Sequence, residues 1–351
     1  MKHDILFTNA THPDGTTLEI AVREGRVAVP RPVDFAPEQT IDCGGAIVSA
    51  PFFNAHTHAA MTLFRGWGDG LPLHEWLSRR IWPAESRMTA DDVYAGTMLG
   101  CLEMIMSGTA FFNDMYWHPE AVVRAVLDSG LRAEICGVLI DMHNPDAARR
   151  QREAAQEFVE SCVGRDPRVS LALGPHAIYT VSADSLAWCG EYSRAIGIRI
   201  HTHISETHRE VEECMKQHGL SPVEYLDRLG MLGDNVVAAH CVWLSDRDVE
   251  ILAERGVVVA HIPVSNAKLA VGEEFRLKRL LDAGVKVLIG TDGASSNNCL
   301  DMFGEMKFAA LTQHSRMNGE CCTHASEILD AATERGRAVF EIGRASCRER
   351  V

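Results

Sequence analysis

The chain has 351 residues, 46% of them hydrophobic and 23% charged, which is enough apolar material for a substantial core. Its 34 Lys and Arg stand against 48 Asp and Glu, and a formal charge of -14 argues against binding nucleic acid through general electrostatics. No apolar run reaches the length of a membrane helix, the N-terminal stretch lacks a signal-peptide core, and the eleven cysteines form no CxxC pair. We therefore expect a cytoplasmic protein with reduced thiols and neither a membrane nor a nucleic-acid partner.

Residues 1–48 carry the pattern of a small β subdomain. Alternating segments such as DILFTNA and TLEIAVREGRVAV are separated by the turn signals PDG and EGR. This pattern predicts short antiparallel strands.

From residue 49 the pattern changes to short apolar runs separated by amphipathic stretches. Thr89 and Asp92 provide capping signals for a helix from about Asp91 to Met106. Strands that alternate with helices pair in parallel, and eight such units favour a (β/α)8 TIM barrel over residues 49–341. The alternative, a doubly wound open sheet, lacks a GxGxxG turn after its first strand. The eight strand-like runs are APFFNAH, GTAFFND, LRAEICG, VSLALGPH, IRIHTHISE, NVVAAHC, GVVVAHIP and VKVLIGTDG.

The last ten residues, IGRASCRERV (342–351), resemble translated sequencing-adapter sequence rather than natural protein. We therefore leave them out of the fold prediction. The alternative interpretation is a basic helical tail.

Polar side chains gather where the predicted strands end, which is the end that builds active sites in this barrel. Histidine ends five of the eight strands, although it is a mediocre strand former and a buried imidazole needs partners. In chain order the strand-end residues are His56, His58, Asn113, Asp114, Cys136, His176, His203, His240, His261 and Asp292.

His56 and His58 form an HxH pair behind the first strand. Side chains at i and i+2 share one face of a strand, so both imidazoles project together and Thr57 faces away. A catalytic zinc ion takes about three or four nitrogen and oxygen ligands. His203 and Asp292 can complete such a set, because barrel closure brings the eighth strand beside the first. The alternative is that the two histidines are hydrogen-bonded loop residues.

Several motifs together resemble the amidohydrolase superfamily, and more narrowly its 5'-methylthioadenosine/S-adenosylhomocysteine deaminases and their triazine-hydrolase relatives. The resemblance covers about residues 3–341. It predicts a hydrolase that acts on C–N bonds of cyclic amidines, with a small β-sandwich of which only the N-terminal half is present here. The motifs are NAHTHAAMTLFRGWGDGLPLHEWL, HISETHREVEE, AHCVWL, SNAKLAVG and GTDGASSNNCLDMFGEM.

The resemblance implies a single Zn²⁺, with Fe²⁺ or another divalent metal as alternatives, held by His56, His58, His203 and Asp292. His203 is preferred to His201 because Glu206 follows it in the HxxE spacing, and we expect His201 to fill the barrel lumen below. The fourth strand ends in GPHAIY, without the lysine that bridges two metals in binuclear members.

Three residues are expected to handle protons. The resemblance implies that Asp292 accepts a proton from water, that His240 orients the attacking hydroxide, and that Glu206 carries a proton to the substrate ring. The alternatives are structural: Glu206 could favour the dipole of an acidic helix, and His240 could be a lumen residue.

The substrate is expected to be a small nucleoside or another N-heterocycle. The resemblance places Glu85 on the ribose hydroxyls, His176 near the nucleoside together with Glu206, and Arg149 as a further contact. Glu85 could instead be a surface residue, and Arg149 could lie on a solvated helix. Cys136 stands where members that use S-adenosylhomocysteine often have arginine, which predicts a preference for 5'-methylthioadenosine or adenosine.

These features predict an aminohydrolase that converts an adenosine-type nucleoside into its inosine analogue and ammonia. Its rivals are a deaminase of guanine, cytosine or pterin, a triazine dechlorinase, and a non-catalytic scaffold of the same fold. A small zinc-type nucleic-acid deaminase would need PCxxC, which is absent. The sequence does not determine the oligomeric state, and a homo-oligomer is one of the open alternatives.

Overall fold

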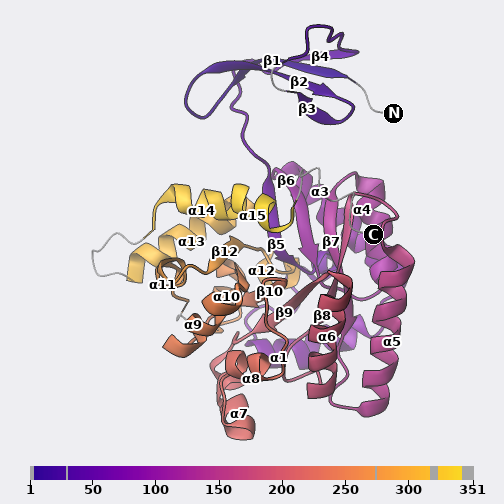
Figure 1. Cartoon of the computed structure of the whole chain (residues 1–351), viewed down its shortest axis with the longest axis vertical. Coiled ribbons are helices and arrows are strands. Elements are labelled where there is room, and N and C mark those ends of the chain that lie inside the picture. Colours follow the sequence, from indigo (N-terminus) through magenta and orange to yellow (C-terminus); the bar gives the residue numbers. More distant parts are fainter. Residues whose placement is uncertain (1–3, 29–30, 273–274, 317–322, 342–351) are drawn as a thin grey trace. The chain divides into compact units, whose positions relative to one another are not determined.

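The computed structural model describes residues 4–28, 31–272, 275–316 and 323–341 (Figure 1). The chain divides into two compact units, Met1–Pro51 and Phe52–Val351. The prediction made for residues 342–351 lies outside the described residues.

The N-terminal unit is a four-stranded sheet with the strand order β3-β2-β1-β4. Strands β1 and β2, and β2 and β3, pair antiparallel as expected, but β4 runs parallel to β1. The prediction of a wholly antiparallel unit is therefore wrong for β4, because the chain returns to the sheet through a connection rather than a hairpin. The bounds are β1 Ile5–Thr11, β2 Thr17–Arg23, β3 Arg26–Ala28 and β4 Gln39–Asp42.

The second unit contains eight parallel strands in sequential order, with helices around them (Figure 1). This arrangement confirms the predicted (β/α)8 barrel. The strands are almost wholly buried because helices cover their outer face and side chains fill the lumen. The bounds are β5 Phe52–Thr57, β6 Thr109–Asp114, β7 Arg132–Leu139, β8 Val169–Pro175, β9 Arg199–Ile204, β10 Val236–His240, β11 Val258–His261 and β12 Lys286–Ile289.

The barrel is closed by contacts between β5 and the chain that follows β12. The backbone N–H of Asp292 donates to the carbonyl of His56 at 3.0 Å. Gly290 permits this approach, because a Cβ atom at that position would lie 2.8 Å from the backbone nitrogen of His56. Closure therefore places His56 beside Asp292.

Helices follow the strands around the barrel, and several of them, including α3, α5, α6, α7, α8 and α9, begin at a side-chain cap. The predicted first long helix is confirmed as α3, with Thr89 and Asp92 forming a capping box. The principal helices are α3 Ala90–Met106, α4 Pro119–Ser129, α5 Pro145–Cys162, α6 Ala183–Ile196, α7 His208–His218, α8 Pro222–Arg228, α9 Asp246–Arg255, α13 Met302–Arg316 and α14 Ala325–Ala332. The short ones are η1 Ala59–Phe64, α1 Leu73–Trp76, η2 Leu77–Ile81, α2 Trp82–Glu85, α10 Pro263–Lys268, α11 Leu277–Asp282, α12 Ala294–Asn297 and α15 Glu334–Val339.

Phe340, which follows α15, closes the end of the barrel where the strands begin. Its ring packs 4.5 Å from that of Phe111, in a buried cluster that also includes Phe53. Arg199 lies over the Phe340 ring and donates to the carbonyl of Val339. This apolar floor leaves the opposite end, where the strands finish, for polar chemistry.

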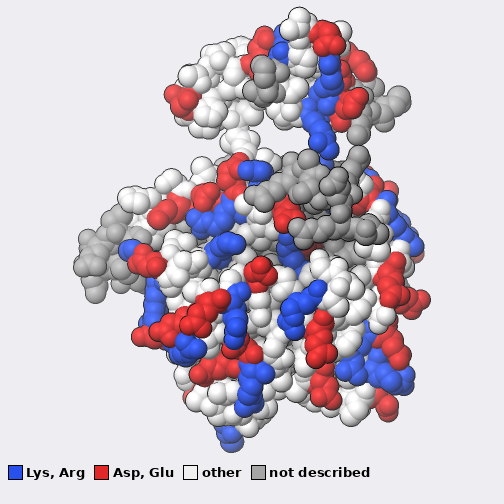
Figure 2. All heavy atoms as spheres, in the orientation of Figure 1, with Lys and Arg blue, Asp and Glu red and all other residues white. Residues whose placement is uncertain are grey.

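Charged side chains of both signs are mixed over the face of the barrel unit that Figure 2 shows. Pairs such as Arg209 with Glu213 and Arg247 with Glu250 neutralise one another on exposed helices. Among the described residues, no helix combines the length and hydropathy needed to cross a membrane.

Candidate metal and active site

The two histidines of the HxH pair and Asp292 converge at the barrel seam. Asp292 Oδ1 lies 3.3 Å from His56 Nε2 and 3.2 Å from His58 Nε2. All three side chains are buried. Thr57, between the histidines, turns away and donates from its hydroxyl to Asp114 Oδ1.

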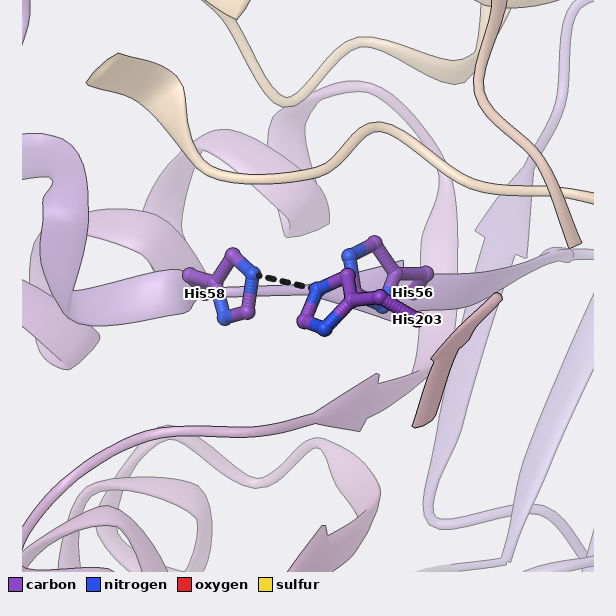
Figure 3. Close-up of side chains that lie close together, drawn as sticks. All are labelled: His56, His58 and His203. Atoms are coloured by element: carbon purple, nitrogen blue, oxygen red, sulfur yellow. Dashed lines mark hydrogen bonds between the residues drawn. The ribbon is translucent and has the colours of Figure 1, made fainter. Parts of the chain in front are cut away.

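His203, from the end of β9, approaches His58 from across the lumen (Figure 3). The two Nε2 atoms are 3.4 Å apart. His58 Nδ1 lies 2.6 Å from the carbonyl of Met115, and His203 Nδ1 lies 2.7 Å from that of His176. Because a carbonyl only accepts hydrogen bonds, both neutral rings carry their proton on Nδ1. Two nitrogen lone pairs therefore face each other.

A cation bound between the two Nε2 atoms would stabilise the facing lone pairs. A hydrogen bond between the two atoms would instead need an additional proton. Burial holds the pKa of His203 well below its ordinary value, so an additional proton on its Nε2 atom is disfavoured. The ligand atoms of His56, His58 and His203 lie within 4.8 Å of one another, as do those of His56, His240 and Asp292. The donor set fits a borderline divalent ion such as zinc.

His201 lies on the other side of the His56 ring. Its Nε2 is 2.7 Å from His56 Nδ1, and its Nδ1 is 3.7 Å from Cys136 Sγ. His201 is fully buried and supports His56 from within the lumen. An outer partner of this kind fixes the orientation of a ligating imidazole.

Asp292 is held as a carboxylate. Burial acts to raise its pKa, but the neighbouring imidazoles of His56, His58 and His240 hold the pKa well below its ordinary value. Its Oδ2 accepts a hydrogen bond from Ser265 at 2.6 Å. The backbone of Asp292 has φ +64°, in the left-handed region that non-glycine residues seldom adopt.

His240 and Glu206 face each other beside this cluster. His240 Nε2 lies 3.7 Å from Glu206 Oε1, and His240 Nδ1 lies 2.8 Å from Asn266 Oδ1. Burial raises the pKa of Glu206 to about 8, with a further contribution from the charge of Asp292. A carboxylic acid that holds its proton at neutral pH can act as a proton donor.

Glu210 fixes the backbone that carries Glu206. Its two carboxylate oxygens accept from the N–H groups of Ser205 at 3.0 Å and Glu206 at 2.8 Å. Glu210 is buried in the first turn of α7, and Ser205 has φ +50°. These bonds hold the strained turn after β9 in one conformation.

A pocket opens in front of these residues. Glu85 lies at its wall and accepts from Trp117 Nε1 at 3.4 Å, while burial raises its pKa. His176 also lines the pocket, with its Nδ1 2.9 Å from the hydroxyl of Thr180. The pocket is lined mainly by apolar and aromatic side chains, including Leu73, Trp76, Leu77, Trp82, Tyr116, Val138, Ile140 and Leu269.

Two residues assigned from the sequence do not reach this pocket. Arg149 lies on the exposed face of α5, where it pairs with Glu153. Cys136 is fully buried one layer below the pocket, because β7 continues to Leu139. Val138, two residues further along the same face of β7, lines the pocket instead.

The residues that support the metal ligands and the proton-handling residues from behind were not predicted from the sequence. Glu210 lies within HISETHREVEE, and Ser265 and Asn266 open SNAKLAVG, so the motifs contained all three without assigning them a role. Glu305 was also missed; it is buried on α13 and accepts from the N–H of Val264. One sequence signal could have identified them: each is a polar residue in a helix, at a position where the neighbouring apolar residues indicate burial.

Residues 47–345 match the family model described as the amidohydrolase family. The chain belongs to the amidohydrolase family, as its motifs predict. It is 46% identical over 302 residues to the 5-methylthioadenosine/S-adenosylhomocysteine deaminase 1 of Archaeoglobus fulgidus, covering 86% of this chain and 71% of the relative. It is also 46% identical to the 5'-deoxyadenosine deaminase of Methanothermobacter thermautotrophicus, covering 87% and 71%.

Solved structures share the fold. An adenosine deaminase from Xanthomonas campestris with bound zinc superposes with a TM-score of 0.87 at 33% identity, covering 97% of this chain and 81% of that one. An atrazine chlorohydrolase from Arthrobacter aurescens complexed with zinc gives a TM-score of 0.83 at 20% identity, covering 96% and 83%. At that lower identity the likeness concerns the fold alone.

Proposed function

We propose that the chain is a divalent-metal-dependent hydrolase that removes the amino group of an adenosine-type nucleoside. The observation that carries the metal is the 3.4 Å approach of His58 Nε2 to His203 Nε2, because both atoms present lone pairs. His56, His58, His203 and Asp292 would hold one ion. Zinc suits these nitrogen and oxygen donors, and Fe²⁺ is the alternative.

When bound, such an ion acts as a Lewis acid and makes water nucleophilic near neutral pH. Glu206 donates its proton to the ring nitrogen beside the amino-bearing carbon, which prepares that carbon for attack. His240 orients the attacking water through the lone pair of Nε2. Asp292 accepts one proton from this water and returns it to the amino group, which departs as ammonia. The second water proton passes from the new hydroxyl group back to Glu206, which leaves a carbonyl oxygen on the ring.

The pocket supports a nucleoside better than a free base. Glu85 offers a carboxylate that can accept hydrogen bonds from the two ribose hydroxyls, and Trp82 and Trp117 offer flat apolar faces. Relatives at 46% identity are named as deaminases of 5-methylthioadenosine and S-adenosylhomocysteine or of 5'-deoxyadenosine. Hydrolysis of a C–N bond in a cyclic amidine is the reaction that these names share.

The test is ammonia release by metal-analysed protein from adenosine, 5'-deoxyadenosine, 5'-methylthioadenosine, S-adenosylhomocysteine and guanine, with chloride release from a chlorotriazine in parallel. We expect turnover of the adenosine-type nucleosides. A preference for guanine or the triazine would replace the proposed substrate with another N-heterocycle. Absence of all turnover with metal bound would favour a non-catalytic scaffold.

A further inference from the structure

The short helix α10 carries two adjacent side chains that contact the proposed proton-handling residues. Ser265 is fully buried and its Oγ lies 2.6 Å from Asp292 Oδ2. Asn266 is 6% exposed and its Oδ1 lies 2.8 Å from His240 Nδ1. We propose that Ser265 and Asn266 are positioning residues that orient Asp292 and His240. The inference rests on the proposed function, since it assigns these contacts to that reaction.

Ser265 distinguishes the two oxygens of Asp292. Oδ1 faces His56 and His58 and also accepts from the N–H of Gly293 at 2.9 Å, whereas Oδ2 is the oxygen that Ser265 reaches. An ionised carboxylate only accepts hydrogen bonds, so the Ser265 hydroxyl donates. This bond opposes rotation of the carboxylate and keeps Oδ1 directed at the histidines.

Asn266 selects the tautomer of His240. Its Oδ1 is an acceptor, so the neutral imidazole carries its proton on Nδ1 and leaves a lone pair on Nε2, the atom that faces Glu206. A ring with its proton on Nε2 could not accept a hydrogen bond from attacking water. The amide therefore prepares His240 for the role proposed for it.

Helix α10 is fixed at both ends, so the two contacts have a rigid base. The N–H of Val264 donates to Glu305 Oε2 at 3.3 Å near its start. Near its end, Lys268 Nζ donates to Asn298 Oδ1 at 2.7 Å and to the carbonyl of Ser295 at 2.8 Å. Sites whose supporting residues are held in this way keep the geometry that catalysis needs.

The first test replaces Ser265 with Ala and, as a weaker donor of similar size, with Cys. We expect Zn²⁺ affinity, measured by competition with a chromophoric chelator, to fall about 10- to 100-fold in Ser265→Ala and less in Ser265→Cys. At saturating Zn²⁺, kcat should fall by a similar factor while KM changes less than about twofold.

Ser295→Ala is the matched control for this test. Ser295 is also fully buried, lies on the adjacent α12, and its hydroxyl has no hydrogen-bond partner among the described residues. This variant should keep both affinity and kcat. Equal effects of Ser265→Ala and Ser295→Ala, or no effect of either, would overturn the role of Ser265.

The second test reads the His240 tautomer directly. In zinc-loaded protein with ¹⁵N-labelled histidine, we expect a protonated Nδ1 and an unprotonated Nε2 for His240, with signals assigned by their loss in His240→Gln. Asn266→Ala should produce a tautomer mixture and a kcat lower by about 10- to 100-fold, and Asn266→Asp should keep the Nδ1 proton. Asn235→Ala, which removes a partly buried amide bonded to Ser193 and Ile198, should change neither readout.

An Nε2-protonated His240 in the unaltered protein, or an unchanged tautomer in Asn266→Ala, would overturn the role of Asn266. Both the chelator competition and the NMR spectra are independent of substrate. If no nucleoside is turned over, the proposed function fails while these two measurements still decide whether the residues position Asp292 and His240.

Discussion

Asn54 and Thr291 exchange two hydrogen bonds across the seam of the barrel. Asn54 Nδ2 donates to Thr291 Oγ1 at 2.7 Å, and the N–H of Thr291 donates to Asn54 Oδ1 at 3.0 Å. Both residues are fully buried, so breaking either bond would leave polar atoms without partners. The pair thereby fixes the register in which His56 meets Asp292.

Removing the metal should abolish turnover and lower the Tm. A ligand that binds only the folded state contributes about 2.7 kcal/mol at 100 times its Kd, so loading with Zn²⁺ should raise the Tm by several degrees. Thermal denaturation of chelator-treated and reloaded protein, with His203→Ala as the variant that cannot respond, checks this. Full activity in metal-depleted protein would contradict the proposal.

Glu206→Gln should lower kcat by about 10²- to 10⁴-fold, because the amide cannot deliver the proton to the substrate ring. The bound metal measured by atomic absorption should stay the same. Glu212→Gln, on the exposed face of α7, is the matched control and should keep full activity. A Glu206→Gln variant with unchanged kcat would exclude this residue as the proton donor.

Glu85→Gln should raise KM for adenosine by about 10- to 100-fold, since a hydrogen bond to a charged group contributes about 1.5–3 kcal/mol. The KM for 2',3'-dideoxyadenosine, which lacks the ribose diol, should hardly change. Steady-state kinetics on both nucleosides make the comparison, and Glu75→Gln, at a half-exposed carboxylate that pairs with Arg79, serves as the control. Equal increases in KM for the two substrates would show that Glu85 does not bind the ribose hydroxyls.

The preferred substrate should have no charged group on its 5' substituent. Neither Lys nor Arg occurs among the described residues that line the pocket, so we expect kcat/KM for 5'-methylthioadenosine to exceed that for S-adenosylhomocysteine. Val138→Arg should raise kcat/KM for S-adenosylhomocysteine about tenfold by pairing with its carboxylate. Comparable values for both substrates in the unaltered protein would be incompatible with this expectation.

Glu305 should make stability fall as the pH rises. Burial raises its pKa from an ordinary 4.5 to about 8, so between these values the folded protein holds a proton that the unfolded chain has released. The free energy of unfolding should therefore decline by up to about 1.4 kcal/mol per pH unit across this window. Urea denaturation from pH 5 to 8 should show a shallower decline in Glu305→Gln, and no such change in slope in Glu120→Gln on the exposed face of α4.

The strands and their polar ends could be predicted from the sequence because both depend on local pattern. His56 and His58 share a face through the two-residue period of a strand, and His203 and Asp292 follow runs of buried residues. Short apolar runs bounded by turn signals are enough to indicate eight strands. The same local pattern therefore predicted both the fold and the candidate metal ligands.

The supporting residues could not be predicted because they depend on how helices approach the barrel. Ser265 and Asn266 lie on a six-residue helix whose position is set by α12 and α13, far away in sequence. Cys136 was placed at a strand end because nothing in LRAEICGVLI marks where β7 stops. The strand end was placed two residues too early, so the pocket position was assigned to Cys136, one layer below the residue that lines the pocket.

The seam also determines the order of events during biosynthesis. Asn54 and Thr291 are 237 positions apart, so a ribosome has made nearly the whole barrel before the two can meet. Until then the nascent chain offers His56 and His58 but no Asp292, and an ion captured early would lack the carboxylate ligand proposed here. Metal loading should thus follow folding of the complete barrel, unlike in small zinc domains, where the ion drives folding.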